Sequence, residues 1–222
     1  MPNTPSELLA HNRHWAEQTT RERPDLFDRL GKGQTPDYLW ISCSDSRVSP
    51  NQALEVDPGE VFVHRNISNV IVQSDLNALS VIQYAVEALK VGHALMVGHY
   101  GCGGCAAAMK GDKLGLIDNW LAHVAEVAHR HADKLDAAAD EHERHTRLCE
   151  LNAIEQAVNL CHTTVLREAW QRGQKLTVHT WMYGLADGLV HDLGMDVDGP
   201  EALMPAYRKA LASLEERWAA RA

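Results

Sequence analysis

The sequence predicts an α/β fold, in which helices flank a mainly parallel central β-sheet, with an N-terminal helical arm and a C-terminal helix. Segments 38–41, 60–66 and 93–99 are short, apolar and rich in β-branched or aromatic residues, and each leads into polar or glycine-rich sequence. Between the second and third of these, residues 74–92 place apolar side chains at steps of three and four, which predicts a crossover helix. Apolar strands joined by such a helix are typical of a parallel sheet.

The remaining elements follow from the same patterns. Residues 6–20 predict an amphipathic helix with Ser6 as its N-cap. Residues 117–171 predict mostly helix, and 175–194 predict a strand, a glycine turn and a shorter strand. Residues 200–218 predict a C-terminal amphipathic helix. The histidine-rich stretch "HRHADKLDAAADEHERH" is interpreted as a solvated helix face.

Composition limits the classes of function. A chain of 222 residues with 45% hydrophobic residues can bury one core, so we expect a single domain over 1–222, with 1–33 as the helical arm. A net charge of −9 argues against nucleic acid or an anionic membrane as partner and favours a small molecule. The first residues contain no apolar run typical of a signal peptide, so we expect a cytoplasmic protein. Five cysteines in a reducing compartment indicate thiols or metal ligands.

A metal site is predicted where the strands end. In an open parallel sheet, ligands bind at the carboxyl ends of the strands, where Cys43, Arg65 and His99 are expected. Within "GHYGCGGC", His99 and Cys102 are two residues apart, and Gly101 permits the tight turn that lets both reach one ion. Adding Cys43 gives two thiolates and one imidazole, a donor set that suits zinc with a fourth position open.

Simpler interpretations exist for each of these residues. A histidine such as His99 is more often a satisfied residue near the core, and a cysteine such as Cys43 is as often an inert buried thiol. Cys105 competes as a ligand through the C-x-x-C spacing, although small residues after a strand more often begin a helix. Cys149 and Cys161 lie in the helical region and are expected to pack in the core.

Three segments resemble the signature sequences of one family. The segments "CSDSRV" at 43–48, "HRNISN" at 64–69 and "GHYGCGGC" at 98–105 are similar, in order and separation, to those of the β-class carbonic anhydrases. The resemblance extends from Gln34 to about Tyr183. It implies an enzyme with one Zn²⁺ per chain that interconverts carbon dioxide and bicarbonate, on a mainly parallel sheet, assembled as a homodimer or homotetramer.

The resemblance also implies roles for individual residues. The zinc ligands fall on Cys43, His99 and Cys102, and a catalytic pair falls on Asp45 and Arg47. The chemistry agrees, because zinc-bound hydroxide would be the nucleophile and Asp45 could accept a hydrogen bond from it. The planar guanidinium of Arg47 suits the task of holding that carboxylate away from the metal. The alternative is a surface ion pair of little energetic value.

A substrate pocket and a regulatory site are implied in the same way. The pocket positions fall on Gln34, Phe62, Ile67 and Tyr84, and the family builds part of each pocket from a neighbouring subunit. Ordinary core packing is the alternative for Phe62 and Tyr84.

One subgroup of the family binds bicarbonate away from the zinc through a tryptophan, an arginine and a tyrosine, which fall on Trp40, Arg65 and Tyr183. In its inactive state the equivalent of Asp45 becomes the fourth zinc ligand. This chain departs from the subgroup at Ser42, where those members have glycine, and a side chain there could crowd the anion.

Two other functions remain open at this point. In a non-catalytic, zinc-stabilised regulator that binds bicarbonate, the three ligands would only tie strand ends together, and Asp45 or Cys105 would stay on the metal as a fourth ligand. Alternatively, the same scaffold could hydrolyse carbon disulfide or carbonyl sulfide.

Overall fold

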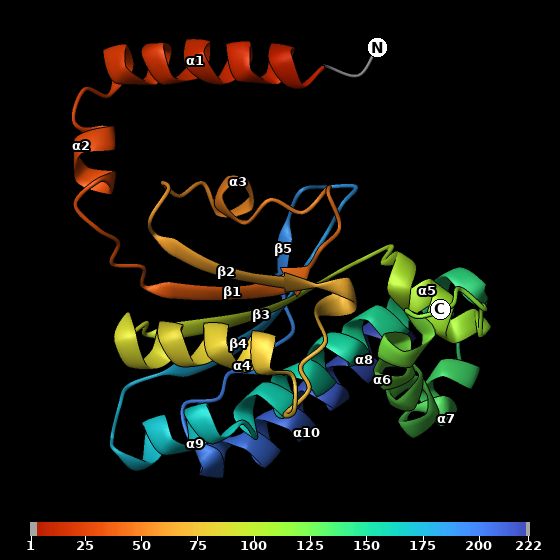
Figure 1. Ribbon diagram of the computed structural model, residues 1–222. Helices are drawn as coiled ribbons and strands as arrows, with labels where there is room; N and C mark the ends of the chain where they lie inside the picture. Colours follow the sequence, from red (N-terminus) through yellow and green to blue (C-terminus); the bar gives the residue numbers. More distant parts are fainter. Residues whose placement is uncertain (1–3, 221–222) are drawn as a thin grey trace. The chain divides into compact units, whose positions relative to one another are not determined.

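The computed structural model describes residues 4–220 (Figure 1). Met1–Asn3 and residues 221–222, the ends of the expected 1–222 domain, lie outside this range. The chain forms two compact units, Met1–Thr35 and Pro36–Ala222, called here the N-terminal unit and the main unit. The boundary after Thr35 lies two residues beyond residue 33, the predicted end of the arm. That the whole chain forms a single domain stays a prediction.

The N-terminal unit contains α1 (Pro5–Glu22) and α2 (Leu26–Leu30), so the predicted helical arm is confirmed. The cap is Thr4 and not Ser6: the Thr4 side chain accepts a hydrogen bond from the Glu7 amide, and Glu7 accepts one from the Thr4 amide. This reciprocal pair satisfies two of the amides that a helix start leaves unpaired, which explains the earlier start. No side chain of α1 is buried.

The main unit is built on a five-stranded sheet with the strand order β2-β1-β3-β4-β5. Its strands are β1 (Tyr38–Cys43), β2 (Val61–Asn66), β3 (His93–His99), β4 (Thr177–Tyr183) and β5 (Val190–Asp192). The first four are parallel, and β5 returns antiparallel to β4 through a glycine-containing turn, as predicted. The register pairs Cys43 with Asn66 and His99 with Tyr183, so these four residues share the carboxyl edge of the sheet.

The helices differ from the sequence prediction mainly in their breaks. The helix predicted over 74–92 is α4 (Leu76–Gln83), followed by a π-helical turn, η2 (Tyr84–Ala88), and it ends early because Lys90 adopts a left-handed conformation. The helical region predicted over 117–171 divides into four helices: α6 (Asp118–Arg130), α7 (Ala132–Asp136), α8 (Glu141–Cys161) and α9 (Thr164–Gln171). The other elements are α3 (Pro50–Leu54), the 3₁₀ turn η1 (Ile67–Asn69), α5 (Gly103–Lys110) and α10 (Pro200–Ala219).

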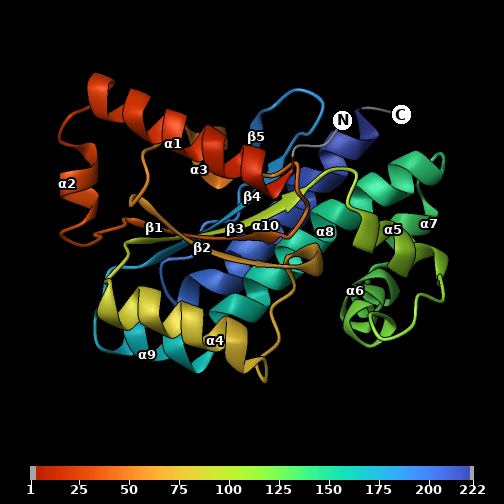
Figure 2. The same cartoon turned by 45° about the horizontal axis from the view of Figure 1, so that its top comes forward.

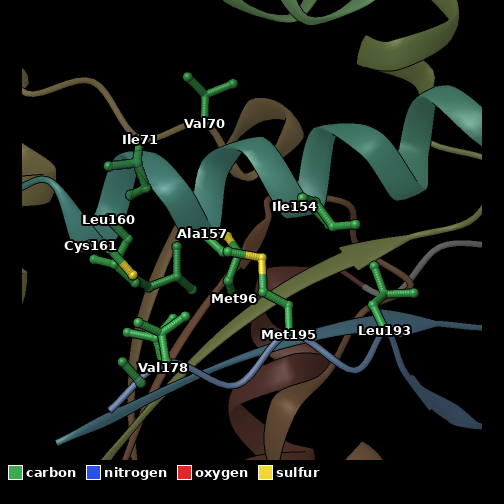
Figure 3. Packing of buried hydrophobic residues seen from close by; sticks show 14 of the residues in the cluster. Val70, Ile71, Met96, Ile154, Ala157, Leu160, Cys161, Val178, Leu193 and Met195 are labelled. Carbon is green, nitrogen blue, oxygen red and sulfur yellow. The ribbon is translucent and has the colours of Figure 1, made fainter. Parts of the chain in front are cut away.

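The main core lies between the sheet and helices α4, α8, α9 and α10, which cover the same face (Figures 1 and 2). Figure 3 shows Ile154 and Ala157 on the side of α8 that faces the sheet, where Met96 of β3 belongs to the same core cluster. At Gly98 the helix approaches so closely that an added Cβ would lie 3.1 Å from that of Ala153. The opposite face carries a smaller cluster, the Trp40 cluster, made by Trp40, Val48, Leu95 and Val97. No helix among residues 4–220 has the length and apolar character needed to cross a membrane.

A buried carboxylate joins three helices on the α8 side. Glu155 of α8 is hydrogen-bonded to His131 Nε2 at 2.9 Å and accepts a hydrogen bond from Tyr207 Oη of α10 at 2.7 Å, and Arg130 pairs with its other oxygen. Burial raises the pKa of Glu155, but hydrogen bonds from His131 and Tyr207 outweigh that effect, so the pKa is lowered. The solvated face expected for this histidine-rich stretch is therefore wrong at His131, which is 4% exposed.

We expect Tyr207→Phe to lower the free energy of unfolding by about 2 kcal/mol, because a hydrogen bond to a buried charge is lost. Since folding lowers the pKa of Glu155, the stabilisation from this network is complete above the ordinary glutamate pKa of about 4.3 and is lost as the pH falls below it. Urea unfolding at neutral and acidic pH measures both effects. An unchanged transition midpoint for Tyr207→Phe at neutral pH would contradict this account.

Candidate metal centre and active site

Cys43, His99 and Cys102 come together at the carboxyl edge of the sheet. Cys43 ends β1, His99 ends β3, and Cys102 is the N-cap of α5. Their ligand atoms all lie within 4.8 Å of one another, the two sulfur atoms are 4.0 Å apart, and all three residues are buried. Among residues 4–220 this is the one group of three or more such side chains with metal-binding spacing.

The imidazole of His99 is oriented to bind a metal. Its Nδ1 lies 3.0 Å from the carbonyl oxygen of Tyr100 and donates a hydrogen bond to it, because a carbonyl can only accept. The ring therefore presents the lone pair of Nε2, and this atom is buried without a hydrogen-bond partner. A buried, unpaired nitrogen beside two thiols fits a metal ligand, and a carbonyl that fixes the tautomer is a common support for one.

The sulfur atoms are held by a loop that sequence analysis did not single out for this purpose. The Ser68 amide donates to Cys43 Sγ at 3.3 Å, and Ser68 Oγ lies 3.6 Å from Cys102 Sγ. Ser68 adopts a left-handed conformation, and Asn152 of α8 donates to its carbonyl. At Gly104 an added Cβ would lie 2.1 Å from Ser68 Oγ, so glycine is required there. The segment "HRNISN" contains Ser68 and could have pointed to its role, but nothing in the sequence around Asn152 indicates that it supports the site.

The electrostatics favour a thiolate in this cluster. Hydrogen bonds from Cys105 and Cys43 lower the pKa of Cys102 well below its usual value, and sharing a proton with Cys102 raises that of Cys43. Burial lowers the pKa of His99, but hydrogen bonding to the Cys102 thiolate and the negative charge of that thiolate outweigh burial, so the pKa is raised. Binding a metal here therefore releases protons and becomes stronger as the pH rises.

Asp45 and Arg47 form a bidentate ion pair beside the cluster. Arg47 Nε donates to Asp45 Oδ1 at 2.9 Å, and Arg47 Nη2 donates to Oδ2 at 2.6 Å. The backbone amide of Arg47 adds a third hydrogen bond to Oδ1. These contacts lower the pKa of Asp45 to about 2. Asp45 Oδ2 is 3.9 Å from His99 Nε2, so a carboxylate is held next to the three candidate ligands.

The remaining cysteines lie outside the cluster of ligands. Cys105 is 1% exposed, packs in the main core and is not one of the three grouped ligands. It lies in the first turn of α5, in agreement with the helix expected there. Cys149 and Cys161 are buried in the main core, as predicted.

The predicted pocket residues are not assembled around the metal cluster within one main unit. The rings of Phe62 and Tyr84 lie against each other, with centroids 5.7 Å apart, and Tyr84 is 51% exposed. Phe62 pairs with Leu39, four residues before Cys43 on β1, so at about 3.3 Å per residue it lies roughly 13 Å from the carboxyl edge.

The other two pocket positions differ in location. Ile67 lies next to the metal cluster, because it precedes Ser68 and its Cγ2 would be 3.1 Å from a Cβ added at Gly104. Gln34 belongs to the N-terminal unit.

Trp40, Arg65 and Tyr183 lie on the sheet face opposite α8. Trp40 is fully buried, and its indole Nε1 is buried without a hydrogen-bond partner. Tyr183 packs against the Trp40 cluster. Arg65 donates from Nε to the carbonyl of Cys43 at 2.9 Å and from Nη2 to that of Asp45 at 2.5 Å. Ser42, which pairs with Arg65 across the two strands, is also buried.

Fold and site together define an α/β protein with a buried Cys/His/Cys group that could hold a metal. The carbonic anhydrase family profile matches residues 38–190. A carbonic anhydrase of Emericella nidulans is 42% identical over 199 residues, covering 90% of this chain and 87% of that protein. The chain belongs to the β-class carbonic anhydrases.

Solved structures agree. A β-carbonic anhydrase of Coccomyxa, in complex with acetazolamide, superposes with a TM-score of 0.84 at 38% identity and covers 90% of each chain. One of two tetrameric β-carbonic anhydrases of Sordaria macrospora has a TM-score of 0.83 at 39% identity, covering 88% of this chain and all of that one. The predicted fold class is confirmed, and family membership supports carbonic anhydrase activity.

Proposed function

We propose that the chain catalyses the reversible hydration of carbon dioxide to bicarbonate and a proton, with one Zn²⁺ held by Cys43, His99 and Cys102. The supporting observation is that a carboxylate fixed by Arg47 stands beside a three-residue ligand cluster. When bound, zinc supplies a Lewis acid that lowers the pKa of water and stabilises negative charge. Three protein ligands leave a position open, as catalytic zinc sites do.

Asp45 and Arg47 would orient the reacting water. With a pKa of about 2, Asp45 is ionised at neutral pH and can only accept a hydrogen bond, which directs the water's remaining lone pair toward carbon dioxide. Arg47 fixes both carboxylate oxygens, so the carboxylate stays in one orientation and away from the metal position. This pair favours an enzyme over a non-catalytic regulator, in which Asp45 or Cys105 would have to bind the metal permanently.

The substrate is tested by isotope exchange. We expect zinc-loaded protein to accelerate the loss of ¹⁸O from ¹³C-labelled bicarbonate to water, followed by mass spectrometry, and metal-stripped protein to lack this effect. Release of hydrogen sulfide from carbonyl sulfide or carbon disulfide is measured in parallel. Sulfide release without ¹⁸O exchange would identify the hydrolase alternative. If the zinc-loaded protein catalysed neither reaction, the non-catalytic regulator would be the remaining alternative.

We propose further that bicarbonate inhibits the enzyme by binding beside Trp40, Arg65 and Tyr183. Trp40 Nε1 is a buried donor without a partner, which an anion could satisfy. Arg65 bridges to the carbonyl of Asp45, so an anion that draws Arg65 away would loosen the segment that carries the catalytic carboxylate. In the inhibited state Asp45 would leave Arg47 and become the fourth metal ligand. Bicarbonate needs only a higher affinity for that state to shift the population.

We expect Tyr183→Phe to weaken inhibition by bicarbonate about tenfold, because one hydrogen bond to a charged group is lost with almost no change in volume. Activity without added bicarbonate should persist at high pH, where the open state predominates. Stopped-flow hydration rates measured against bicarbonate concentration determine the inhibition constant.

Tyr38→Phe is the matched control, since Tyr38 packs against the same cluster from the amino end of β1. Identical, purely competitive inhibition of the wild type and Tyr183→Phe would place the anion at the metal alone. Ser42 would then be the residue that separates this chain from the bicarbonate-sensing subgroup.

We propose a homodimer or homotetramer in which Phe62 and Tyr84 of one subunit complete the pocket of a neighbouring subunit, beside the Ile67 that lies next to that subunit's own metal cluster. Gln34 is the fourth residue proposed to line the pocket. The two aromatic rings form an accessible pair roughly 13 Å from their own carboxyl edge, which suits a role in another chain's pocket. Apolar side chains left exposed on α1 provide further surface for association: Leu8, Leu9 and Trp15 are 53%, 61% and 51% exposed.

Subunit mixing tests this arrangement. Arg47→Ala protein and Tyr84→Ala protein are mixed under conditions that allow subunit exchange. The activity of the mixture is compared with the activities of the two unmixed variants, its parents. If the pocket is shared, a mixed dimer contains one site with both residues intact, and the mixture is more active than the mean of its parents. Activity equal to that mean, with subunit exchange verified by mass spectrometry, would show that each chain builds its own pocket.

We also propose a cytoplasmic location. All five cysteines are unpaired and buried thiols, which suits a reducing compartment. Fractionation of cells that produce the protein tests this directly.

A further inference from the structure

A cavity lies next to the metal cluster, because Tyr100 and Gly101, the two residues between the ligands His99 and Cys102, line it. It has a volume of about 460 Å³ and is enclosed by four segments: the turn after β3, helix α8, the β4–β5 hairpin and helix α10. We call it the basic cavity, because its lining includes His142, His145, His191 and Arg217. None of the three residues of the proposed bicarbonate site, Trp40, Arg65 and Tyr183, lines this cavity, although Leu185 in its wall packs against the Trp40 cluster. The cavity is therefore distinct from the proposed bicarbonate site.

Arg217 carries an unused pair of donors in this wall. Its Nε and Nη2 atoms are buried and have no hydrogen-bond partner in the described part of the chain. These two nitrogens form the edge of the guanidinium that grips an oxyanion with two parallel hydrogen bonds. Leaving buried donors unsatisfied costs free energy, which an acceptor brought by a ligand would recover.

Other arginines of the main unit show how this edge is normally used. Arg47 directs Nε and Nη2 at the carboxylate of Asp45, and Arg147 directs the same two atoms at Glu143. Arg172 binds the side-chain oxygen of Gln174 in the same way. Each of these edges has an oxygen acceptor, and the missing acceptor at Arg217 indicates a place for an external oxyanion.

The charges around the cavity agree with an anionic ligand. Its one carboxylate, that of Asp187, is already engaged by the Leu189 amide at 3.0 Å and by His191 Nε2 at 3.2 Å. His145 uses Nε2 to donate to the Cys102 carbonyl. His142 on α8 is exposed, so its imidazole is accessible to a ligand next to Arg217.

We propose that the basic cavity binds a small organic phosphate. A bicarbonate ion would leave most of 460 Å³ empty, whereas this volume is typical of pockets for small metabolites. Leu185 and Ala186 supply an apolar wall for the organic part. Arg217, once its side chain turns so that the buried Nε and Nη2 face the cavity, and the exposed His142 supply donors for the phosphate oxygens. The proposal is independent of carbonic anhydrase activity.

Isothermal titration with glycerol 3-phosphate and with inorganic phosphate, on zinc-loaded protein at constant ionic strength, tests this proposal. We expect one glycerol 3-phosphate per chain with a Kd of about 1 mM or lower, and weaker binding of inorganic phosphate. Arg217→Gln should weaken glycerol 3-phosphate binding at least about tenfold, and His142→Gln should weaken it several-fold.

Arg208→Gln is the matched control, because it removes the same charge from an exposed position of the same helix. Circular dichroism and zinc content verify that each variant is folded. Binding that survives Arg217→Gln unchanged would place the phosphate at the metal or elsewhere and overturn the proposal. If Arg217→Gln and Arg208→Gln weakened phosphate binding equally, the loss of affinity would come from the change in net charge, and the proposal would be overturned as well. Absence of measurable binding to the wild type would do the same.

Discussion

Replacing Cys43, His99 or Cys102 with alanine is expected to lower the affinity for zinc at least about a hundredfold, because the loss of a residue that only supports a ligand already costs about ten- to a hundredfold. The three ligand atoms lie within 4.8 Å of one another and are buried, so each substitution leaves only two of the three ligands in place. Competition with a chromophoric chelator measures the affinity, and elemental analysis gives the zinc content.

Cys105→Ala is the matched control for these variants. It removes a buried thiol three residues after Cys102 that packs in the main core, and it should retain one zinc per chain. Circular dichroism separates loss of metal from loss of fold. A full complement of zinc in Cys43→Ala, or loss of zinc in Cys105→Ala with the fold intact, would contradict the ligand assignment.

Arg47→Ala is expected to keep its zinc and lose about a hundredfold in kcat/KM for hydration, because a misplaced catalytic group typically costs that much. The side chain of Arg47 is the main cause of the low pKa of Asp45, so its removal raises that pKa toward the ordinary value of about 3.9. The Asp45 carboxylate remains ionised at neutral pH in this variant. The loss of kcat/KM would therefore result from a change in the orientation of the carboxylate and not from its protonation. Stopped-flow kinetics with parallel zinc analysis measure the two quantities.

Arg172→Ala is a suitable control, since Arg172 is exposed and makes a similar two-nitrogen contact with Gln174. It should leave kcat/KM and zinc content unchanged. Near-normal activity in zinc-replete Arg47→Ala would show that the Asp45–Arg47 pair has only a structural role.

The sheet and the metal cluster could be predicted from sequence because their signals are local. Apolar runs that end in "SCSDSRV" and "GHYGCGGC" fix both the strands and the residues at their carboxyl ends. A parallel arrangement then brings Cys43 near His99, although 56 positions separate them in the chain. The positions of Asp45 and Arg47 can then be predicted as well, because both residues lie close to the ligand Cys43 in the turn that follows β1.

The supports of the site depend on tertiary contacts and carry no local signal. Asn152 looks like any polar residue of a helix, yet it is buried and holds the carbonyl of Ser68. His131 lies in a strongly charged stretch, and only the packing of α8 and α10 shows that it is bound to Glu155. The unused donors of Arg217 become visible only when four separate segments enclose them.

Stopped-flow hydration of carbon dioxide by zinc-loaded protein, from about pH 6 to pH 9, tests the central claim most directly. Two thiolates and one imidazole cancel the charge of zinc, so water ionises there at higher pH than at a site of three neutral imidazoles. The account predicts zinc-dependent catalysis that increases with pH and levels off on the mildly alkaline side. A rate equal to the uncatalysed reaction at every pH, with one zinc per chain, would contradict it.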